Sequence, residues 1–366
     1  MRTGFFWDEH CFWHGGGNYA GLLQVGGLVQ PGGGLPENPE TKRRLVNLMR
    51  VTGLWDHLDT RSADPVTEED LLRIHPAHYL QAFREKSAQG GGELGLRTPF
   101  GPDGYTIATL SAGLAKAALF ATLQGTHRTA YALSRPPGHH CLPDFPNGFC
   151  LLANIAIAIE SAMASGLTDR VAVIDWDVHH GNGTEAIFYD RPDVLTISVH
   201  QDRNYPLDSG DFADRGSDAG EGFNLNVPLP PGTGHAGYVE AFERLVVPAL
   251  HAFQPDAIIV ACGFDASLVD PLSRMIAGAE TFRALTDMTM EAAAALCDGR
   301  LTLVHEGGYS EVHVPFCGHQ VLESLSGSDT HAPDPFQQKF EGQQPSERFN
   351  RYVSTLIAEM EQTLGF

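Results

Sequence analysis

The chain has 366 residues, of which 42% are hydrophobic, and its 45 acidic and 24 basic residues give a formal net charge of −21. This composition predicts a folded protein with a sizeable core, built as one large domain or two ordinary ones. Nucleic acids and anionic membranes attract clustered lysine and arginine, so the acidic excess argues against either as the main partner. The charge is compatible with a cationic substrate or simply with a soluble surface.

The first hundred residues are predicted to be rich in loops, because glycine clusters recur at 15–17, 32–34 and 90–92. Asp8 and Glu9 interrupt any signal-peptide core, and no apolar run approaches the roughly 20 residues of a membrane span. Apolar spacing predicts a helix within 38–58. A second helical segment, 67–86, starts at the capping pair Thr67 and Asp70 and breaks where the sequence reads "HPAHY". The segment 105–123, rich in alanine and leucine, predicts a long helix.

From residue 129 onwards, short apolar runs alternate with helical segments. Strands that alternate with helices predict a parallel sheet, and continuous apolar strands indicate burial on both faces. These segments cover 129–134, 154–164, 171–177, 194–200, 235–253, 257–265, 279–296 and 300–309, with helices at 235–253 and 279–296. The sequence therefore predicts an α/β protein with helices on both faces of a central parallel sheet.

A last helix, 349–364, is predicted to pack through one apolar face, formed by Phe349, Val353, Leu356, Met360 and Leu364. The chain shows no internal repeat and no linker, so we predict a single domain over 1–366. Within it we distinguish a loop-rich N-terminal part with rim loops (1–105), a catalytic core (106–325) and a C-terminal extension with the packing helix (326–366). The six cysteines form no CxxC pair, which predicts reduced thiols in a cytoplasmic protein.

The predicted strands run into segments that carry chemistry: "RPPGHH", "WDVHHGNG", "HQD", "FD" and "GGY". Parallel sheets bind ligands at the carboxyl ends of their strands, so these segments should converge. Asp175, Asp177 and His179 are two residues apart and share one face of an extended strand end. Asp177 and His179, joined by Asp265 from another strand, would hold a tetrahedral metal with one open position, which is typical of catalytic zinc. The same ligands would also accept Fe(II) or Mn(II).

The rigid "PPG" turn before His139 and His140 would aim both imidazoles into the same cavity. One can act as general base and one can return the proton to a leaving group, and their roles differ if their pKa values differ. Asp175 is placed to orient one imidazole and Asn182 the other, and only the aspartate favours a charged imidazole. The division of roles between the two histidines stays open at this point.

Gly307 and Gly308 allow the backbone to approach the site closely, and Tyr309 could donate its phenol to a developing oxyanion. Each of these motifs alone would be typical of an ordinary hydrogen-bonded turn. Together they favour a catalytic site, because buried carboxylates without partners cost several kcal/mol each. The set is suited to amide hydrolysis, whereas His235, His305, His313 and His319 are predicted to be structural.

In these motifs the sequence resembles the histone deacetylase superfamily, and within it the class II enzymes and the bacterial histone-deacetylase-like amidohydrolases. The motifs read "RPPGHH", "GFCLLANIAIA", "VIDWDVHHGNGT", "TISVHQ", "GFNLNVPLPPGTG", "GFDASLVDPL" and "EGGYSEVHVPFCG". The resemblance covers most of the chain and implies an arginase/deacetylase-like α/β domain. It implies that Asp177, His179 and Asp265 bind zinc and that Tyr309 stabilises the oxyanion. Asn182, where class I enzymes have aspartate, matches class II.

The resemblance also implies two potassium sites. The inner site would use Asp175, Asp177, His179, Ser198 and Val199, partly through carbonyl groups. The peripheral site would use the carbonyl groups of Phe188, Arg191, Val194 and Phe223.

The resemblance further implies a tunnel for an acylated lysine, with Phe149 and Tyr205 as walls and Leu272 at the rim. Gly148 would accept the amide proton of the substrate, and Gly308 would lie beside the tunnel. Tyr205 stands where many relatives have phenylalanine. The polyamine-specific relative has an acidic residue at the position of Leu272, so this leucine argues against a polyamine substrate.

We therefore expect a zinc-dependent amidohydrolase that removes acetyl-type groups from N-acyl-lysine or similar amines, with His140 chiefly as base and His139 assisting. An acetylpolyamine or other small-amide deacetylase is one alternative. A catalytically silent acyl- or metal-binding regulator is another, and arginase-like hydrolysis is disfavoured because only one three-ligand site is evident. The family resemblance also suggests a homo-oligomer, either a dimer or a tetramer.

Overall fold

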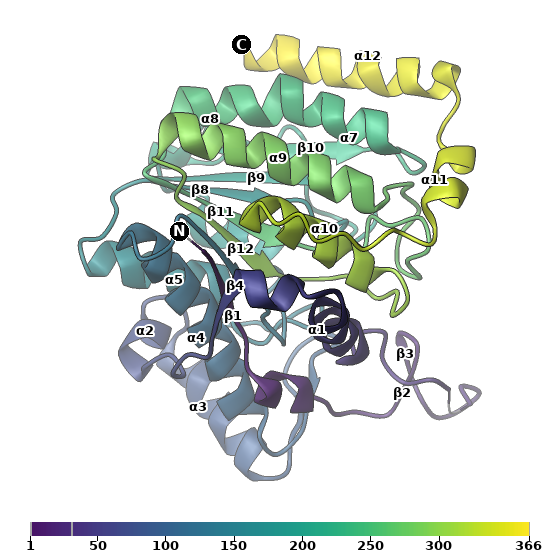
Figure 1. The fold of residues 1–366 in the computed structure, drawn as a ribbon. Helices are drawn as coiled ribbons and strands as arrows, with labels where there is room; N and C mark the ends of the chain where they lie inside the picture. Colours follow the sequence, from purple (N-terminus) through teal and green to yellow (C-terminus); the bar gives the residue numbers. More distant parts are fainter. Residues whose placement is uncertain (1, 31, 366) are drawn as a thin grey trace.

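A parallel sheet of eight strands forms the centre of the computed structural model, which describes residues 2–30 and 32–365 (Figure 1). The strand order is β10-β9-β8-β11-β12-β7-β1-β4, and all neighbours run parallel. The strands are β1 (Thr3–Phe6), β4 (Leu58–Arg61), β7 (Thr129–Ala132), β8 (Val171–Asp175), β9 (Val194–Gln201), β10 (Asn224–Leu229), β11 (Ala257–Cys262) and β12 (Leu301–His305). The predicted central parallel sheet is confirmed.

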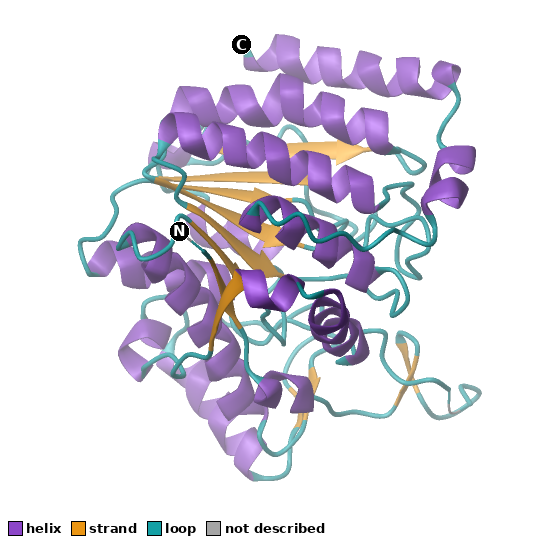
Figure 2. Ribbon diagram, viewed as in Figure 1, coloured by secondary structure: helices purple, strands orange, loops and turns teal. Residues whose placement is uncertain are grey.

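Helices surround this sheet (Figure 2). On one side α10 packs against α9 and α1, and on the other α4 packs against α5 and β7 (Figure 1). The helices are α1 (Glu40–Thr52), α2 (Glu68–Leu72), α3 (Ala77–Ala88), α4 (Gly104–Leu123), α5 (Asn154–Ala164), α6 (Asn182–Phe188), α7 (His235–Ala241), α8 (Val247–Phe253), α9 (Ala279–Leu296), α10 (Val314–Ser326), α11 (Gln337–Gln343) and α12 (Glu347–Leu364). Two short antiparallel pairs, β2–β3 (Tyr19–Ala20, Leu23–Gln24) and β5–β6 (Gly92–Glu93, Pro99–Phe100), lie outside the central sheet.

The long predicted helix at 105–123 is α4, which by length and composition alone could span a membrane. In this fold 72% of its apolar window is buried, against α5, β1 and β7. The high hydrophobicity of α4 is therefore explained by its burial as a core helix against the sheet. The cysteines within the described residues are buried free thiols, as the spacing predicted.

Helix boundaries differ from the predictions where backbone geometry intervenes. The helix predicted within 38–58 ends at Thr52, because Gly53 adopts a left-handed φ of 88° and stops it. Thr67 and Asp70 form the predicted capping box of α2, and α3 begins after Pro76. The predicted helix at 235–253 is interrupted by a π-helical turn between α7 and α8.

Three strands of the sheet were not predicted: β10, β1 and β4. β1 pairs with β7 and β4, so the first 105 residues contribute two strands to the sheet in addition to loops and helices. Both strands have four residues, which is too short for apolar alternation to stand out beside the surrounding loops. At the other end of the chain, α12 packs through Val353, Ile357 and Met360, so Ile357 joins the predicted face.

Candidate active site

Four neighbouring strands of the sheet deliver the predicted site residues to one place. β8 pairs with β11, β11 with β12, and β12 with β7, so their carboxyl ends lie side by side. All the following side chains are buried: His139 and His140 after β7, Asp175, Asp177 and His179 at the end of β8, Asp265 after β11, and Tyr309 after β12. Residues separated by up to 170 positions therefore meet because parallel strands share one edge.

Asp177, His179 and Asp265 form a compact set of potential metal ligands, with their ligand atoms all within 4.8 Å of one another. Nδ1 of His179 lies 3.0 Å from Oδ1 of Asp177 and 3.1 Å from Oδ2 of Asp265. Ligands of a tetrahedral zinc ion stand about 3.3 Å apart, given the usual metal–ligand distances. Oδ2 of Asp265 is buried and has no hydrogen-bond partner among the described residues, since Nδ1 of His179 lies near it without hydrogen-bond geometry. A buried carboxylate oxygen in this state is costly without a cation. The residues present therefore fit a divalent metal ion.

Backbone N–H groups fix the outer oxygens of both carboxylates. Gly307 donates to Oδ2 of Asp177 at 2.8 Å, and Val178 donates to Oδ1 of Asp265 at 2.8 Å. A Cβ atom on Gly307 would lie 2.2 Å from Oδ2 of Asp265 and 2.5 Å from Oδ2 of Asp177. Glycine at 307 thus allows the segment after β12 to close against both carboxylates.

The charges of this set act strongly on one another. Burial raises the pKa of Asp177, but the neighbouring His139 and His179 outweigh burial and hold that pKa below its ordinary value. Burial and the nearby Asp177 raise the pKa of Asp265 to about 6. Two carboxylates held this close repel each other, and a divalent cation between them would relieve that repulsion.

His139 and His140 lie against each other, with ring centroids 3.9 Å apart. Nδ1 of His139 is 2.9 Å from Oδ2 of Asp175, and Nδ1 of His140 is 2.8 Å from Oδ1 of Asn182. Burial lowers the pKa of His139, but the charges of Asp177 and Asp175 outweigh burial and raise it overall. Burial and the positive charge of His139 lower the pKa of His140. One imidazole is therefore suited to carry charge and the other to stay neutral.

Two buried carboxylates beside the site were not predicted. Oε2 of Glu306 accepts hydrogen bonds from the backbone of Gly138 at 2.7 Å and His139 at 3.1 Å, and so fixes the turn that carries both histidines. Burial raises the pKa of Glu306 to about 7. Asp270 accepts the backbone N–H of Tyr309 at 2.7 Å. The sequence signal was their position within the "HEGGY" and "SLVDPL" motifs, but only the fold shows which backbone groups they contact.

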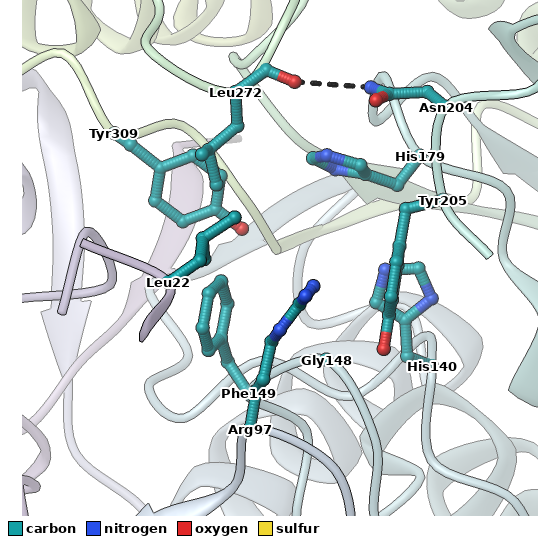
Figure 3. A pocket seen from close by; sticks show the side chains of 10 residues that line it. All are labelled: Leu22, Arg97, His140, Gly148, Phe149, His179, Asn204, Tyr205, Leu272 and Tyr309. Carbon is teal, nitrogen blue, oxygen red and sulfur yellow. Dashed lines mark hydrogen bonds between the residues drawn. The ribbon is translucent and has the colours of Figure 1, made fainter. Parts of the chain in front are cut away.

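A narrow pocket of about 120 Å³ leads to this constellation (Figure 3). Phe149 and Tyr205 face each other across it, and His140, His179 and Tyr309 lie around its inner part (Figure 3). Tyr205 contacts His140 edge-on, with centroids 5.1 Å apart. The residues that line the pocket are Leu22, Arg97, His140, Gly148, Phe149, His179, Asn204, Tyr205, Leu272 and Tyr309.

The pocket therefore brings together Gly148, Phe149, Tyr205 and Leu272, as the predicted tunnel requires. Gly308 is not among the residues that line it, and a Cβ added at Gly308 would meet Phe264 and Val314 at 3.0 Å. Leu22, Arg97 and Asn204 were not predicted, since they lie in loops whose course the sequence pattern does not define.

The predicted potassium residues lie on and just after β8, in and after α6, on β9 and directly before β10. Ser198 on β9 pairs with Asp175 on β8, so these two residues of the predicted inner site lie side by side. For the peripheral site, the carbonyl of Phe188 accepts a hydrogen bond from Arg191, and that of Phe223 accepts one from Thr196. Each carbonyl keeps a second lone pair for a cation.

A family model described as the histone deacetylase domain matches residues 35–325 of the chain. The chain belongs to the histone deacetylase family. It is 55% identical over 366 residues to a histone deacetylase-like amidohydrolase of Pseudomonas aeruginosa, covering 100% of this chain and 96% of the relative. It is 35% identical to histone deacetylase 8 of Arabidopsis thaliana, covering 91% of this chain and 90% of that protein.

The solved structure of the HDA15 HD domain matches the fold with a TM-score of 0.82 and 29% identity, covering 100% of this chain and 96% of that one. A probable deacetylase of Archaeoglobus fulgidus is 35% identical over 81% of this chain and 84% of its own length. The protein is thus a deacetylase-type hydrolase that acts on the amide bond of an acylated substrate. Histone deacetylase family members are generally metal-dependent, and the buried Asp–His–Asp set is a candidate metal site.

Proposed function

We propose that this protein is a zinc-dependent amidohydrolase that removes acetyl-type groups from N-acyl-lysine or similar acylated amines. The observation that carries the proposal is the position of Asp177, His179 and Asp265 at the inner end of an aromatic-walled pocket. His140 and Tyr309 line the same pocket. A potential metal site, a base and an oxyanion donor therefore surround one point.

Zinc held by Asp177, His179 and Asp265 would polarise the amide carbonyl and lower the pKa of an attacking water. The same ligands also suit Fe²⁺, so iron remains the second candidate metal. The absence of a hydrogen-bond partner on buried Oδ2 of Asp265 supports a resident cation of either kind.

His140 is suited to accept the proton of the attacking water, because burial and the neighbouring His139 keep its pKa low and its imidazole neutral. His139, paired with Asp175, holds positive charge beside it and stabilises the negative charge that develops on the substrate. Asn182 orients His140 without adding charge.

Tyr309 is the donor for the carbonyl oxygen as that oxygen becomes negative. Burial raises the pKa of Tyr309, with the charges of Asp265 and Asp177 adding to the effect, so the phenol keeps its proton. Asp270 accepts the backbone N–H of Tyr309 and so holds the segment from which the ring projects.

Phe149 and Tyr205 would enclose the aliphatic chain of the lysine, with Gly148 accepting the amide proton and Leu272 at the rim. Burying the four methylene groups of a lysine side chain is worth about 3 kcal/mol. The narrow pocket thus favours a long thin substrate. We also propose potassium at the two predicted cation sites, and we retain the predicted cytoplasmic location and homo-oligomeric state as expectations.

The alternative of an acetylpolyamine deacetylase is disfavoured by the lining of the pocket, which includes Leu272 and Arg97 and no carboxylate to attract a second amine. A silent acyl-binding regulator is disfavoured because the potential base, the oxyanion donor and the ligand set occur together.

The test is turnover by purified protein supplied with zinc and potassium. Acetyl-lysine peptide should be hydrolysed well and acetylputrescine poorly, and a series of acyl lengths would define the leaving acid. Asp265→Asn should abolish activity, whereas Asp298→Asn, which changes an exposed carboxylate, should not. If the zinc-loaded protein hydrolyses neither an acyl-lysine nor an acylamine, the proposal is wrong.

A further inference from the structure

The open end of the pocket carries an arginine without an acidic partner. Among the described residues that line the pocket, Arg97 is the one whose side chain is permanently charged. Within the described residues its guanidinium has no carboxylate within 4.0 Å, and the hydrogen bond that Arg97 forms uses its backbone carbonyl. The guanidinium carbon lies 5.6 Å from the centre of the Tyr205 ring. Figure 3 shows the side chain extending between Phe149 and Tyr205 with its nitrogens directed into the pocket.

The backbone holds Arg97 in this place at the cost of local strain. Arg97 has a φ of 57°, and Gly148 and Phe149 opposite it have φ values of 50° and 70°. The two segments are tied together, since Gly148 donates to the carbonyl of Leu96 at 3.0 Å and Phe149 donates to that of Arg97 at 3.0 Å. Left-handed non-glycine residues persist where the surroundings impose them, and they cluster at functional sites.

The nearest acidic side chain on the same loop is already engaged. Glu93 accepts hydrogen bonds from the hydroxyl of Tyr19 at 2.8 Å and from the backbone of Thr98 at 2.8 Å. The protein has 45 acidic residues against 24 basic ones, so acidic partners are abundant, yet none pairs with this arginine within 4.0 Å in the described residues. The N–H donors of Arg97 are thus left for a ligand that enters the pocket.

We propose that Arg97 is a specificity residue that binds a carboxylate on the amine side of the substrate. This inference rests on the proposed function, in which the acyl group lies beside His140, His179 and Tyr309. Arg97 is partly exposed at the opposite, open end, so it faces what is attached to the lysine. The carboxylate is either that of an acidic residue next to the acyl-lysine in a peptide or the α-carboxylate of free acyl-lysine. The same positive charge repels the free ammonium groups of acylated polyamines.

The experiment compares matched substrates that differ only in this carboxylate. One pair is an acetyl-lysine peptide with Glu or Gln beside the acetyl-lysine, and the other is free Nε-acetyl-lysine and its α-carboxamide. The wild-type enzyme should favour the acidic member of at least one pair about tenfold in kcat/KM, mainly through KM, as expected for one charge-assisted hydrogen bond. The preference should shrink as salt is added.

Arg97→Gln should lower kcat/KM for the acidic member about tenfold more than for the neutral member, so that the preference is lost. Arg97→Lys should retain part of it, because lysine keeps the charge but lacks the planar donor pair. Arg351→Gln makes the same change in net charge on the exposed face of α12, where Arg351 is 72% exposed, and should leave the preference intact.

The two pairs separate the possible sources of the carboxylate. A preference found only in the peptide pair means that Arg97 binds a neighbouring acidic side chain. A preference found only in the free amino acid pair means that Arg97 binds the α-carboxylate. Equal losses of kcat/KM for acidic and neutral members in Arg97→Gln would overturn the proposal in favour of a structural role. So would a wild-type enzyme without preference in either pair.

A wild-type enzyme that cleaves none of these substrates would contradict the proposed function but not the role of Arg97. Calorimetric binding of the Glu and Gln peptides to the wild-type protein and to Arg97→Gln then still tests the role of Arg97. Equal affinity for both peptides in the wild-type protein would overturn it.

Discussion

Replacement of Gly307 by alanine tests whether the two carboxylates hold a metal ion in the arrangement described. The added Cβ would lie 2.2 Å from Oδ2 of Asp265 and 2.5 Å from Oδ2 of Asp177, whereas ordinary contact begins near 3.4 Å. Relief of the closer contact requires a displacement of about 1.2 Å, while metal–ligand distances tolerate only about 0.2 Å. Rotation of the two carboxylates is restrained. The backbone N–H of Gly307 donates to Oδ2 of Asp177, and that of Val178 donates to Oδ1 of Asp265.

We therefore expect Gly307→Ala to lose about 100-fold in zinc affinity, the upper end of what altered support of a metal ligand costs. Deacetylation should fall in parallel at limiting zinc. Competition with a fluorescent zinc chelator measures the affinity directly, and circular dichroism shows whether the variant is folded. Gly342→Ala is the matched control, because a Cβ on Gly342 in α11 meets nothing within 4 Å. A folded Gly307→Ala protein with wild-type zinc affinity would refute the assignment of Asp177 and Asp265 as joint ligands.

Three further outcomes are expected. Tyr309→Phe should lower kcat on an acetyl-lysine peptide about 100- to 1000-fold with little change in KM, because an oxyanion donor acts in the transition state, and unchanged turnover would exclude this role. Removal of metal with dipicolinate should abolish activity and lower the melting temperature, and added zinc should restore both, since a ligand of the native state stabilises it; a chelator-treated protein that retains full activity would contradict a metal-dependent reaction. Burial lowers the pKa of His75 to about 4, so between pH 6.5 and pH 4 this histidine is protonated in the unfolded chain and neutral in the folded protein. The free energy of unfolding should therefore fall by about 3 kcal/mol as the pH falls from 6.5 to 4. Urea unfolding at pH 7 and pH 4.5 measures this loss, which should be smaller in His75→Gln; an equal loss in both proteins would assign the acid sensitivity elsewhere.

The convergence of chemistry at the strand ends could be predicted because it depends on local patterns. The apolar run before Asp175 identifies a buried strand, and the two-residue spacing of Asp175, Asp177 and His179 fixes their common face. Asp265 follows a later apolar strand, β11, and β11 indeed pairs with β8. The lengths of the apolar strands and the spacing of the polar residues at their ends were enough to predict that these residues converge.

The rest of the site depends on contacts that no local pattern encodes. Glu306 and Asp270 act on backbone N–H groups of distant segments, at Gly138 and Tyr309, so their roles appear only once the loops are packed. Arg97 lies in a glycine-rich loop whose left-handed conformation is imposed by the segment around Phe149. Gly308 was assigned to the tunnel by its motif, and the packing of Phe264 and Val314 around an added Cβ there appears only in the fold.

The position of β12 in the sheet also has a consequence for how the chain becomes active during synthesis. β12 lies between β11 and β7, so without it the strands form two separate groups, β10-β9-β8-β11 and β7-β1-β4. Leu301–His305 are among the last sheet residues to leave the ribosome, and until then both groups present an unpaired edge. Glu306, Gly307 and Tyr309 follow directly after β12, so joining the halves of the sheet and completing the catalytic constellation are one event. Enzymatic activity in a refolding or translation reaction should therefore report closure of the whole sheet, with no active intermediate before it.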